Sequence, residues 1–289
     1  MASLESCPSG SPVLELVLAG FAAALLALPG FAQAARPSSN LVPREIIRQR
    51  LREVTNKNAE REATLKQMFE DAGCFGDRLT EQPVPNSRLP NLICERPGAT
   101  DAVILVGAHF DKVQAGAGVV DNWSGASLLP SLFQSLGQSP GPGMRRHTFI
   151  FVGFTDEERG LVGSRYFVRH LTPPQRARIH AMIDLDTLGL GPAKVFLAHS
   201  DARLAEAAET VARQMGLPLQ VFNVRNVDDD SQPFQRAKVP TLMIHSATAA
   251  TLRILHSPAD QMVRIRFDDY YDTYRLLAEC LTFVDSRIE

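Results

Sequence analysis

The sequence predicts an α/β fold, a single domain in which a mixed, mostly parallel β-sheet is sandwiched between helices in three layers. Three observations favour this fold. Runs rich in β-branched and aromatic residues alternate with segments of helical spacing, which is typical of strand–helix–strand units. The runs at 102–108 and 147–154 are nearly continuous in apolar residues, as expected of strands buried on both faces. After residue 35 the chain has neither an internal repeat nor a second composition.

Length and charge narrow the possible functions. A chain of 289 residues can bury a sizeable core and fits one large domain or two small ones. It carries 30 Lys and Arg residues against 32 Asp and Glu residues, so no basic field would recruit nucleic acid. The composition is that of an ordinary soluble globular protein and leaves the oligomeric state open.

Residues 1–34 are expected to be a signal peptide. The run 13–28 is almost unbroken apolar sequence, and Ala32-Gln33-Ala34 follows as a small-x-small cleavage site. The run is too short for a membrane span. Because no Lys or Arg precedes it, a retained N-terminal anchor and a misassigned start codon are the alternatives. We expect a secreted or periplasmic protein that begins near Ala35, with no other membrane contact.

A helical section is expected at 35–73, ahead of a core at 74–289. After a linker with Pro and Ser, apolar side chains recur at helical spacing around Leu51 and Phe69, and Gly73 ends the second helix. Short apolar runs predict strands near 92–94 and at 102–108, 147–154, 179–185, 195–197 and 241–244. Helical spacing predicts helices at 124–136, 163–171 and 201–215, and an amphipathic closing helix at 267–284.

Three cysteines remain once Cys7 leaves with the signal peptide. Cys74 follows a helix end and Cys94 closes a short apolar run, so the two could lie on paired strands and form a disulfide in an oxidising compartment. Cys280 falls on the apolar stripe of the closing helix and is expected to be a buried free thiol.

Five separated segments carry side chains that bind metals or move protons. They are His109-Phe110-Asp111, Asp121-Asn122-Trp123-Ser124-Gly125, Glu157-Glu158, Asp184-Leu185-Asp186 and His256-Ser257-Pro258-Ala259-Asp260. Alone, each is weak, because a His-x-Asp is more often a hydrogen-bonded pair and two glutamates are usually a solvated face. Most of them follow a strand-like run, so their side chains can converge at one edge of a sheet. This joint pattern predicts a metallohydrolase.

The order and spacing of these segments resemble the co-catalytic zinc aminopeptidases, a family of exopeptidases that also contains the glutaminyl cyclases. The likeness runs from about residue 74 to the closing helix. It implies a zinc-dependent peptidase domain at 35–289 with two zinc ions. His109 and Asp186 would hold one zinc, and Glu158 and His256 the other, with Asp121 as the bridge between them. Glu157 would be the base that takes a proton from the water between the metals.

The chemistry of this ligand set supports the resemblance. Two cations about 3.5–4 Å apart need a shared carboxylate to offset their repulsion. Imidazole and carboxylate ligands without cysteine suit a hydrolytic zinc pair. Asp184 competes with Asp186 for one position, and the family pattern favours Asp186 because it directly follows Leu185 and precedes Gly189 by three residues.

Neighbouring residues are expected to orient the ligands. Asp111 can accept the other imidazole N–H of His109 and fix its tautomer, which makes it part of the catalytic set, and Asp260 could play a similar part near His256. The turn at 122–125 leads into a helix, and its backbone amides are expected to hold the bridging carboxylate.

Other polar residues are expected to be ordinary. Four histidines, His147, His170, His180 and His199, are read as solvated or capping groups, and His245 as a satisfied core residue in preference to a pocket residue. The run 228–230 is most simply an exposed acidic loop. However, 230–234 resembles a pocket-lining segment of the family that usually has His where Ser231 stands, and an acidic group there could attract a substrate ammonium.

We expect an aminopeptidase that cleaves peptides with a free N-terminus. A glutaminyl cyclase with a single zinc is the alternative enzyme, although cyclases typically have Trp where this chain has Leu255. Many aminopeptidases have Tyr at that position, which assists the developing oxyanion, so the rate is also in question. A third possibility is a non-catalytic relative that acts as a binding ectodomain; loss of a ligand or of Glu157 would favour it, and none is lost.

Overall fold

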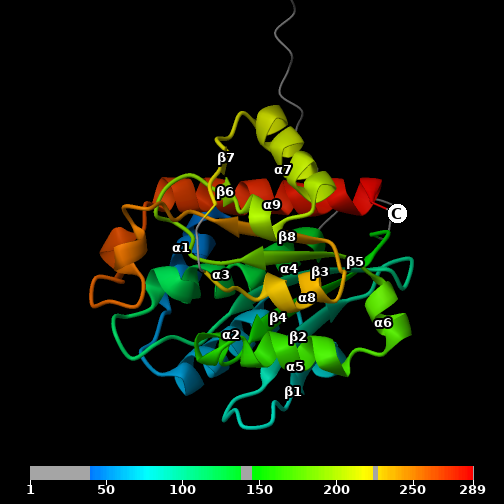
Figure 1. Cartoon of the computed structure of the whole chain (residues 1–289), viewed down its shortest axis with the longest axis horizontal. Helices are drawn as coiled ribbons and strands as arrows, with labels where there is room; N and C mark the ends of the chain where they lie inside the picture. The colour runs from blue at the N-terminus through cyan, green and yellow to red at the C-terminus, as the bar shows by residue number, and fades with distance from the viewer. Residues whose placement is uncertain (1–39, 138–144, 224–226, 289) are drawn as a thin grey trace, which may run out of the picture. The chain divides into compact units, whose positions relative to one another are not determined.

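An eight-stranded mixed sheet forms the centre of the fold, in the order β1-β2-β4-β3-β5-β8-β6-β7 (Figure 1). The computed structural model describes residues 40–137, 145–223 and 227–288. The strands are β1 (Leu79–Gln82), β2 (Asn91–Arg96), β3 (Val103–His109), β4 (Thr148–Phe154), β5 (Ile179–Leu185), β6 (Lys194–Val195), β7 (Gln220–Val221) and β8 (Thr241–His245). The central strands β4, β3, β5 and β8 are parallel, whereas β1, β2 and β6 join the sheet through antiparallel pairs.

Helices cover both faces of the sheet. One layer packs into the larger apolar core and consists of α1 (Arg44–Arg52), α2 (Asn58–Asp71), α3 (Ser124–Ala126), α4 (Leu129–Gly137), α7 (Ala202–Met215) and α9 (Phe267–Arg287). The other layer consists of α5 (Val162–His170), α6 (Pro173–Ala177) and α8 (Ser231–Arg236). The predicted three-layer α/β fold is therefore confirmed. The predicted boundary after residue 34 lies outside the described residues.

The central strands are buried on both faces, as their apolar runs predict. In β3, Ile104 and Val106 point into the larger core, whereas Val103 and Leu105 point into the smaller one. This alternation follows from the two-residue period of a strand. Because His109 pairs with Phe154 across β3 and β4, these parallel strands end at the same edge of the sheet.

The structure differs from the predicted elements in three places. The helix predicted at 124–136 is divided into α3 and α4, because Pro130 lacks an N–H and cannot continue the helical hydrogen bonds. The strand predicted at 195–197 is shorter, and a 3-10 turn, Leu197–His199, follows it. The elements β1, α6, β7 and α8 were not predicted, since they are short and lack a clear apolar period.

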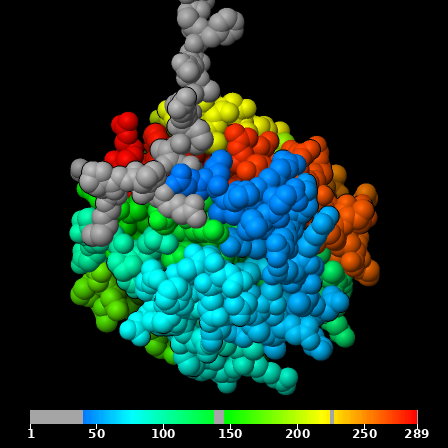
Figure 2. All heavy atoms as spheres, turned by 180° about the vertical axis from the view of Figure 1, so that it is seen from behind, coloured from blue at the N-terminus to red at the C-terminus, as the bar shows by residue number. Residues whose placement is uncertain are grey.

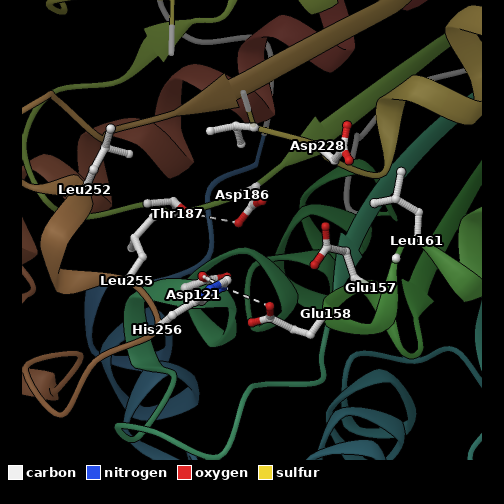
Figure 3. Close-up of a pocket in the computed structure, with 12 residues that line it drawn as sticks. Asp121, Glu157, Glu158, Leu161, Asp186, Thr187, Asp228, Leu252, Leu255 and His256 are labelled. Atoms are coloured by element: carbon white, nitrogen blue, oxygen red, sulfur yellow. Dashed lines mark hydrogen bonds and ion pairs between the residues drawn. The ribbon is translucent and has the colours of Figure 1, made fainter. Parts of the chain in front are cut away.

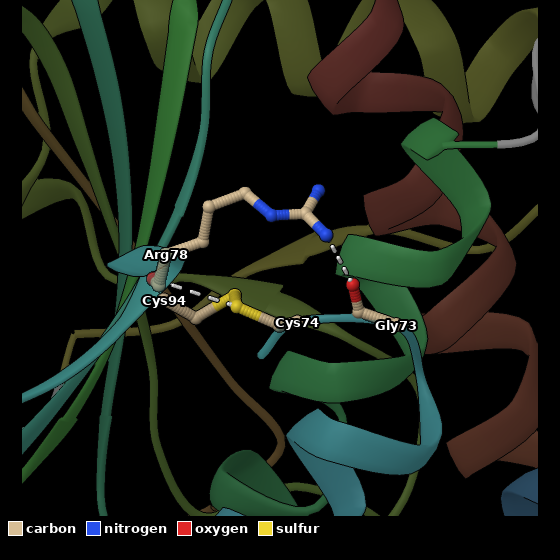
Figure 4. The surroundings of a disulfide bond; sticks show 4 residues. All are labelled: Gly73, Cys74, Arg78 and Cys94. Carbon is tan, nitrogen blue, oxygen red and sulfur yellow. Dashed lines mark hydrogen bonds between the residues drawn. A yellow bond between two sulfur atoms is a disulfide. The ribbon is translucent and has the colours of Figure 1, made fainter. Parts of the chain in front are cut away.

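A disulfide joins Cys74, just after α2, to Cys94 on β2 (Figure 4). The two cysteines are 20 positions apart in the sequence, and the bridge ties the N-terminal helical section to the sheet. Cys280 is a buried free thiol on α9, as expected. Within the described ranges, every helix is too short or too polar to cross a lipid bilayer.

We expect removal of this disulfide to destabilise the fold. Closing a loop of about 20 residues lowers the entropy of the unfolded chain and contributes about 3 kcal/mol. Replacement of Cys74 and Cys94 by Ala should lower the free energy of unfolding by about that amount, as measured by urea denaturation. The control is the unmodified protein with and without reductant. If reductant leaves its unfolding midpoint unchanged, the bridge has no such role.

Candidate metal centre

The five predicted segments meet at one edge of the sheet, beyond the carboxyl ends of its parallel strands. Figure 3 shows side chains from four of them, all except the segment of His109. His109 is the last residue of β3, and Asp186 directly follows β5. Glu157 and Glu158 open a short 3-10 turn, Glu157–Arg159, that follows β4. The ends of buried parallel strands thus place these four side chains close together in space, although they come from three separate parts of the sequence.

Asp121 and His256 come from loops on either side of this edge. Asp121 lies in the turn Val119–Trp123 that leads into α3, and its peptide bond to Asn122 is cis. His256 follows the turn Leu252–Ile254. The side chain of His256 is 58% exposed, whereas that of His109 is only 2% exposed. One imidazole therefore faces the solvent and the other lies within the protein.

The side chains form two groups that share Asp121. In the first group, His109 Nε2 lies 3.3 Å from Asp121 Oδ1 and 3.7 Å from Asp186 Oδ1. In the second group, His256 Nε2 lies 3.1 Å from Asp121 Oδ2 and 2.8 Å from Glu158 Oε2. The two oxygens of one carboxylate thus face two different imidazoles. Asp121 occupies the position of a bridge.

Charge attraction between imidazoles and carboxylates dominates both groups. Hydrogen bonds to Asp121 and Glu158 raise the pKa of His256 to about 10, against the effect of burial. Burial would lower the pKa of His109, but Glu157 and the neighbouring aspartates outweigh it and hold this pKa well above its usual value. Burial would raise the pKa of Asp121, yet the two imidazoles beside it lower this pKa. A bound cation would replace the charge of these imidazolium groups.

Several buried atoms lack partners and fit a divalent cation. His109 Nε2 and Glu158 Oε1 are buried without a hydrogen-bond partner. Such atoms are usually satisfied, because leaving them unpaired in the protein interior costs free energy. In each group, one ligand atom per residue lies within 4.8 Å of the others. Both groups combine imidazole with carboxylate and contain no thiolate, which is a donor set that suits zinc.

Glu157 lies beside both groups without belonging to either. Its side chain is 12% exposed, and its Oε2 is 3.8 Å from His109 Nε2. Burial raises its pKa well above the usual value, and Asp230 and Asp186 add to the shift. A carboxyl group of this kind holds a proton more readily than an ordinary glutamate does, which suits a group that accepts and returns protons.

Asp111 supports the metal centre in more ways than the sequence indicated. Its backbone carbonyl lies 3.2 Å from His109 Nδ1, and its carboxylate oxygen lies 3.5 Å from the same nitrogen. The carboxylate also accepts hydrogen bonds from the backbone amides of Glu157 at 3.0 Å and Glu158 at 3.3 Å. One carboxylate therefore holds three neighbouring residues of the site in place.

Two expectations about supporting residues were wrong. Asp260 was expected to orient His256, but its carboxylate accepts hydrogen bonds from the backbone amides of Val120 and Asp121. The backbone amides of the turn 122–125 were expected to hold the bridging carboxylate, but the amide of Trp123 donates to the carbonyl of Gly118 and the amide of Gly125 donates to the side chain of Asn122. Asn122 in turn donates to the carbonyl of Leu185, where a Cβ on Gly125 would lie only 2.3 Å away. These contacts join backbone segments that no local pattern connects.

The run 228–230 is not an exposed loop, because Asp229 and Asp230 are buried. The amide of Ser231 donates to Asp184 Oδ2 at 3.0 Å, so Asp184 is engaged at the start of α8 and lies in neither cation-binding group. Burial raises the pKa of Asp230 to about 7, against the effects of His109 and the Ser164 hydroxyl. This acidic residue lies behind the site rather than in solvent.

The other histidines divide into two kinds. His147 and His199 are not solvated as expected: His147 Nδ1 lies 3.1 Å from Asp285 Oδ1 and His199 pairs with Asp229. His170 is exposed, and His180 is only partly buried. His245 is a satisfied core residue, since its Nε2 lies 2.9 Å from the carbonyl of Phe222.

A cavity of about 390 Å³ opens in front of the two groups. Its apolar walls are Leu161, Val227, Leu252 and Leu255, and Asp228 also lines it (Figure 3). Leu161, Val227 and Leu252 were not singled out from the sequence. They lie in turns and loops without a periodic pattern, so no sequence signal marks them.

Comparison with known proteins agrees with this geometry. A family model described as peptidase family M28 matches residues 91–281. Leupeptin-inactivating enzyme 1 of Streptomyces exfoliatus is 27% identical over 151 residues, which are 52% of this chain and 34% of the relative. The chain thus spans about a third of the length of that relative.

Two solved structures share the fold. The LapA aminopeptidase of Legionella pneumophila aligns with a TM-score of 0.68 at 17% identity, over 87% of this chain and 77% of that one. A glutaminyl cyclase of an Acidobacteriales bacterium aligns with a TM-score of 0.68 at 20% identity, over 89% of this chain and all of the other. The family match covers well over half of the 289 residues. The chain belongs to peptidase family M28.

Proposed function

We propose that the protein is a zinc-dependent aminopeptidase that removes the N-terminal residue of peptides. The observation that carries this proposal is the pair of ligand groups that share the two oxygens of Asp121. His109 and Asp186 would hold one zinc, and Glu158 and His256 the other. Membership of a peptidase family supports the same activity.

The chain's own residues account for the movement of protons. Zinc, when bound at these ligands, supplies a Lewis acid and lowers the pKa of water. Glu157 faces the cavity and accepts a proton from the water that attacks the scissile carbonyl carbon. When the C–N bond breaks, Glu157 returns that proton to the leaving amine. Asp111 keeps Glu157 in place through its hydrogen bond to the backbone amide.

The cavity walls and the acidic surroundings suit a peptide N-terminus. Leu161, Val227, Leu252 and Leu255 offer apolar contact to the first side chain of the substrate. The carboxylates around the metal centre favour a free ammonium group. Leu255 has no hydroxyl and therefore offers no hydrogen-bond donor to a developing oxyanion.

A glutaminyl cyclase is the second candidate, because the chain covers the whole of one cyclase structure with the same fold. Cyclisation would release ammonia from an N-terminal glutamine, whereas hydrolysis would release the N-terminal amino acid. A panel of aminoacyl-nitroanilides, together with glutaminyl peptides, separates the two enzymes. Failure of the zinc-loaded protein to turn over either class of substrate would favour a non-catalytic relative.

The number of zinc ions can be tested by replacing single ligands. We expect about two zinc ions per chain by elemental analysis, one after His256→Ala, and none after Asp121→Ala, since Asp121 serves both groups. The control is Glu206→Gln, at an exposed position of α7. A single zinc in the unmodified protein would contradict the shared-bridge arrangement.

Glu157→Gln should separate metal binding from turnover. Glutamine keeps the shape of the side chain but cannot accept the proton, so kcat should fall by about 100- to 10,000-fold. Because Glu157 belongs to neither ligand group, zinc content should not change. Kinetics on an aminoacyl-nitroanilide and elemental analysis of the same sample provide the two measurements. Unchanged turnover would remove Glu157 from the role of base.

We also propose that the protein is exported and that residues 1–34 are removed. The apolar run at 13–28 and the small residues before Ala35 support a cleaved signal. The Cys74–Cys94 disulfide supports an oxidising compartment. Intact-mass measurement on the periplasm or medium of an expressing bacterium should show a chain that begins near Ala35 without free thiols at Cys74 and Cys94. A full-length chain confined to the cytoplasm would refute export.

A further inference from the structure

Helix α2 contacts both ends of the loop that carries the bridging Asp121. At one end, the side-chain amide of Asn58 donates to the carbonyl of Lys112 at 3.3 Å and accepts from its backbone amide at 3.2 Å. At the other end, Arg61 donates to the carbonyls of Ala117, at 3.2 Å, and Gly118. Asn58 and Arg61 are three residues apart and therefore lie on the same face of the helix.

Arg61 is buried and has no close acidic partner. Its exposure is 0%, its guanidinium carbon lies 5.3 Å from the ring centre of Trp123, and no carboxylate oxygen is within 4.0 Å in the described residues. Burial lowers its pKa to about 10, while Asp111, Asp260 and other carboxylates at longer range act in the opposite direction. A buried cation is costly unless its donors are used. Here both terminal nitrogens of Arg61 donate to the backbone of the loop, whereas Nε has no partner.

The same loop is held from its other side by Asp260. The backbone carbonyl of Asp260 accepts from Ala117 at 2.8 Å, and its carboxylate accepts from Val120 at 2.8 Å and Asp121 at 3.1 Å. There is no spare room, because a Cβ on Gly118 would lie 2.8 Å from an Arg61 nitrogen. The backbone that leads to Asp121 is therefore fixed between α2 and the segment that follows His256.

We propose that Arg61, with Asn58, is a positioning residue that clamps the loop 112–121 and so prepares Asp121 to bridge two cations. The N-terminal helical section lies outside the residues that match the family model, yet it reaches the metal centre from behind. Figure 2 shows this section, α1 and α2, in blue on the face opposite to that of Figure 1. This proposal adds a positioning role to the zinc aminopeptidase function proposed above. It rests on that function for the measurement of zinc affinity.

Two possible roles for Arg61 predict opposite changes in zinc affinity when Arg61 is replaced. As a mere positive charge near the carboxylates it would repel zinc, so its removal would tighten zinc binding, and lysine would replace it fully. As a clamp it needs two N–H groups on two carbonyls, which the single ammonium of lysine cannot reproduce. The bidentate contacts of Arg61 favour the clamp.

The test compares Arg61→Met, Arg61→Lys and the control Met68→Ala in the full chain. Met68 is a buried residue of the same helix. Its side chain packs into the apolar core and forms no hydrogen bond with the loop 112–121. Competition with a chromogenic chelator should show zinc affinity at least about tenfold weaker in both Arg61 variants. Their kcat should fall with little change in KM, whereas Met68→Ala should lower the melting temperature and leave zinc affinity unchanged.

A second readout needs no metal. In chelated protein, hydrogen exchange at the amides of Ala117, Val120 and Asp121 should be faster in Arg61→Lys than in the unmodified protein and in Met68→Ala. If the unmodified protein binds no zinc, the proposed function fails, whereas this exchange measurement still tests the clamp. Unchanged exchange in Arg61→Lys would overturn the clamp even if zinc binds normally.

Asn58→Ala covers the case in which Arg61→Met does not fold. Asn58 is only partly buried, and its removal should speed exchange at Lys112 and weaken zinc binding in the same direction. Tighter zinc binding in Arg61→Met, with Arg61→Lys equal to the unmodified protein, would overturn the proposal in favour of a pure charge effect. Zinc affinity that is equal in all these proteins would overturn it as well.

Discussion

Crowding of negative charge is the constraint on which the site depends. Asp121, Glu157, Glu158 and Asp186 lie around one cavity, and Asp230 is buried behind them. Carboxylates this close repel each other, and burial removes the water that would screen them. Nearby positive charge relieves this repulsion, and so does a proton bound to a carboxyl group whose pKa is raised, such as Glu157 or Asp230. The imidazoles supply some of the positive charge, and the donor set is suited to divalent cations that supply the rest.

The parallel sheet brings these charged side chains together. Strands such as β3 and β5 are buried on both faces, so their positions are fixed by apolar packing and not by the polar residues at their ends. The stability of the core therefore offsets the cost of a crowded acidic edge. Apolar packing thus fixes the strands, and the strands place the polar side chains, which explains why the proposed metal ligands follow apolar runs in the sequence.

The sequence predicted what depends on local pattern. The strand at 179–185 has the predicted bounds, and the five segments gather as expected, because apolar periodicity and the residue at a strand end are local features. It did not predict α8, the burial of Asp229 and Asp230, or the contacts of Asp260 and Gly125. These features depend on which backbone N–H and C=O groups, far apart in the sequence, come to need a hydrogen-bond partner. Nearly every residue carries the same two backbone groups, so no pattern in the sequence marks the ones involved. The preference for Asp186 over Asp184 needed the family pattern, since both lie at the end of the same strand.

The unequal exposure of the two imidazoles has a kinetic consequence. His256 stands largely in solvent on a loop, while His109 is enclosed at the end of a central strand. Both groups open on the same cavity. An ion held by His256 and Glu158 would be able to leave by movement of one surface side chain, whereas an ion held by His109 and Asp186 would be released only by movement of enclosed side chains. If two cations bind as proposed, they would therefore exchange at different rates, with the outer one in faster equilibrium with the solvent. Metal supply would then regulate occupancy of the outer position first.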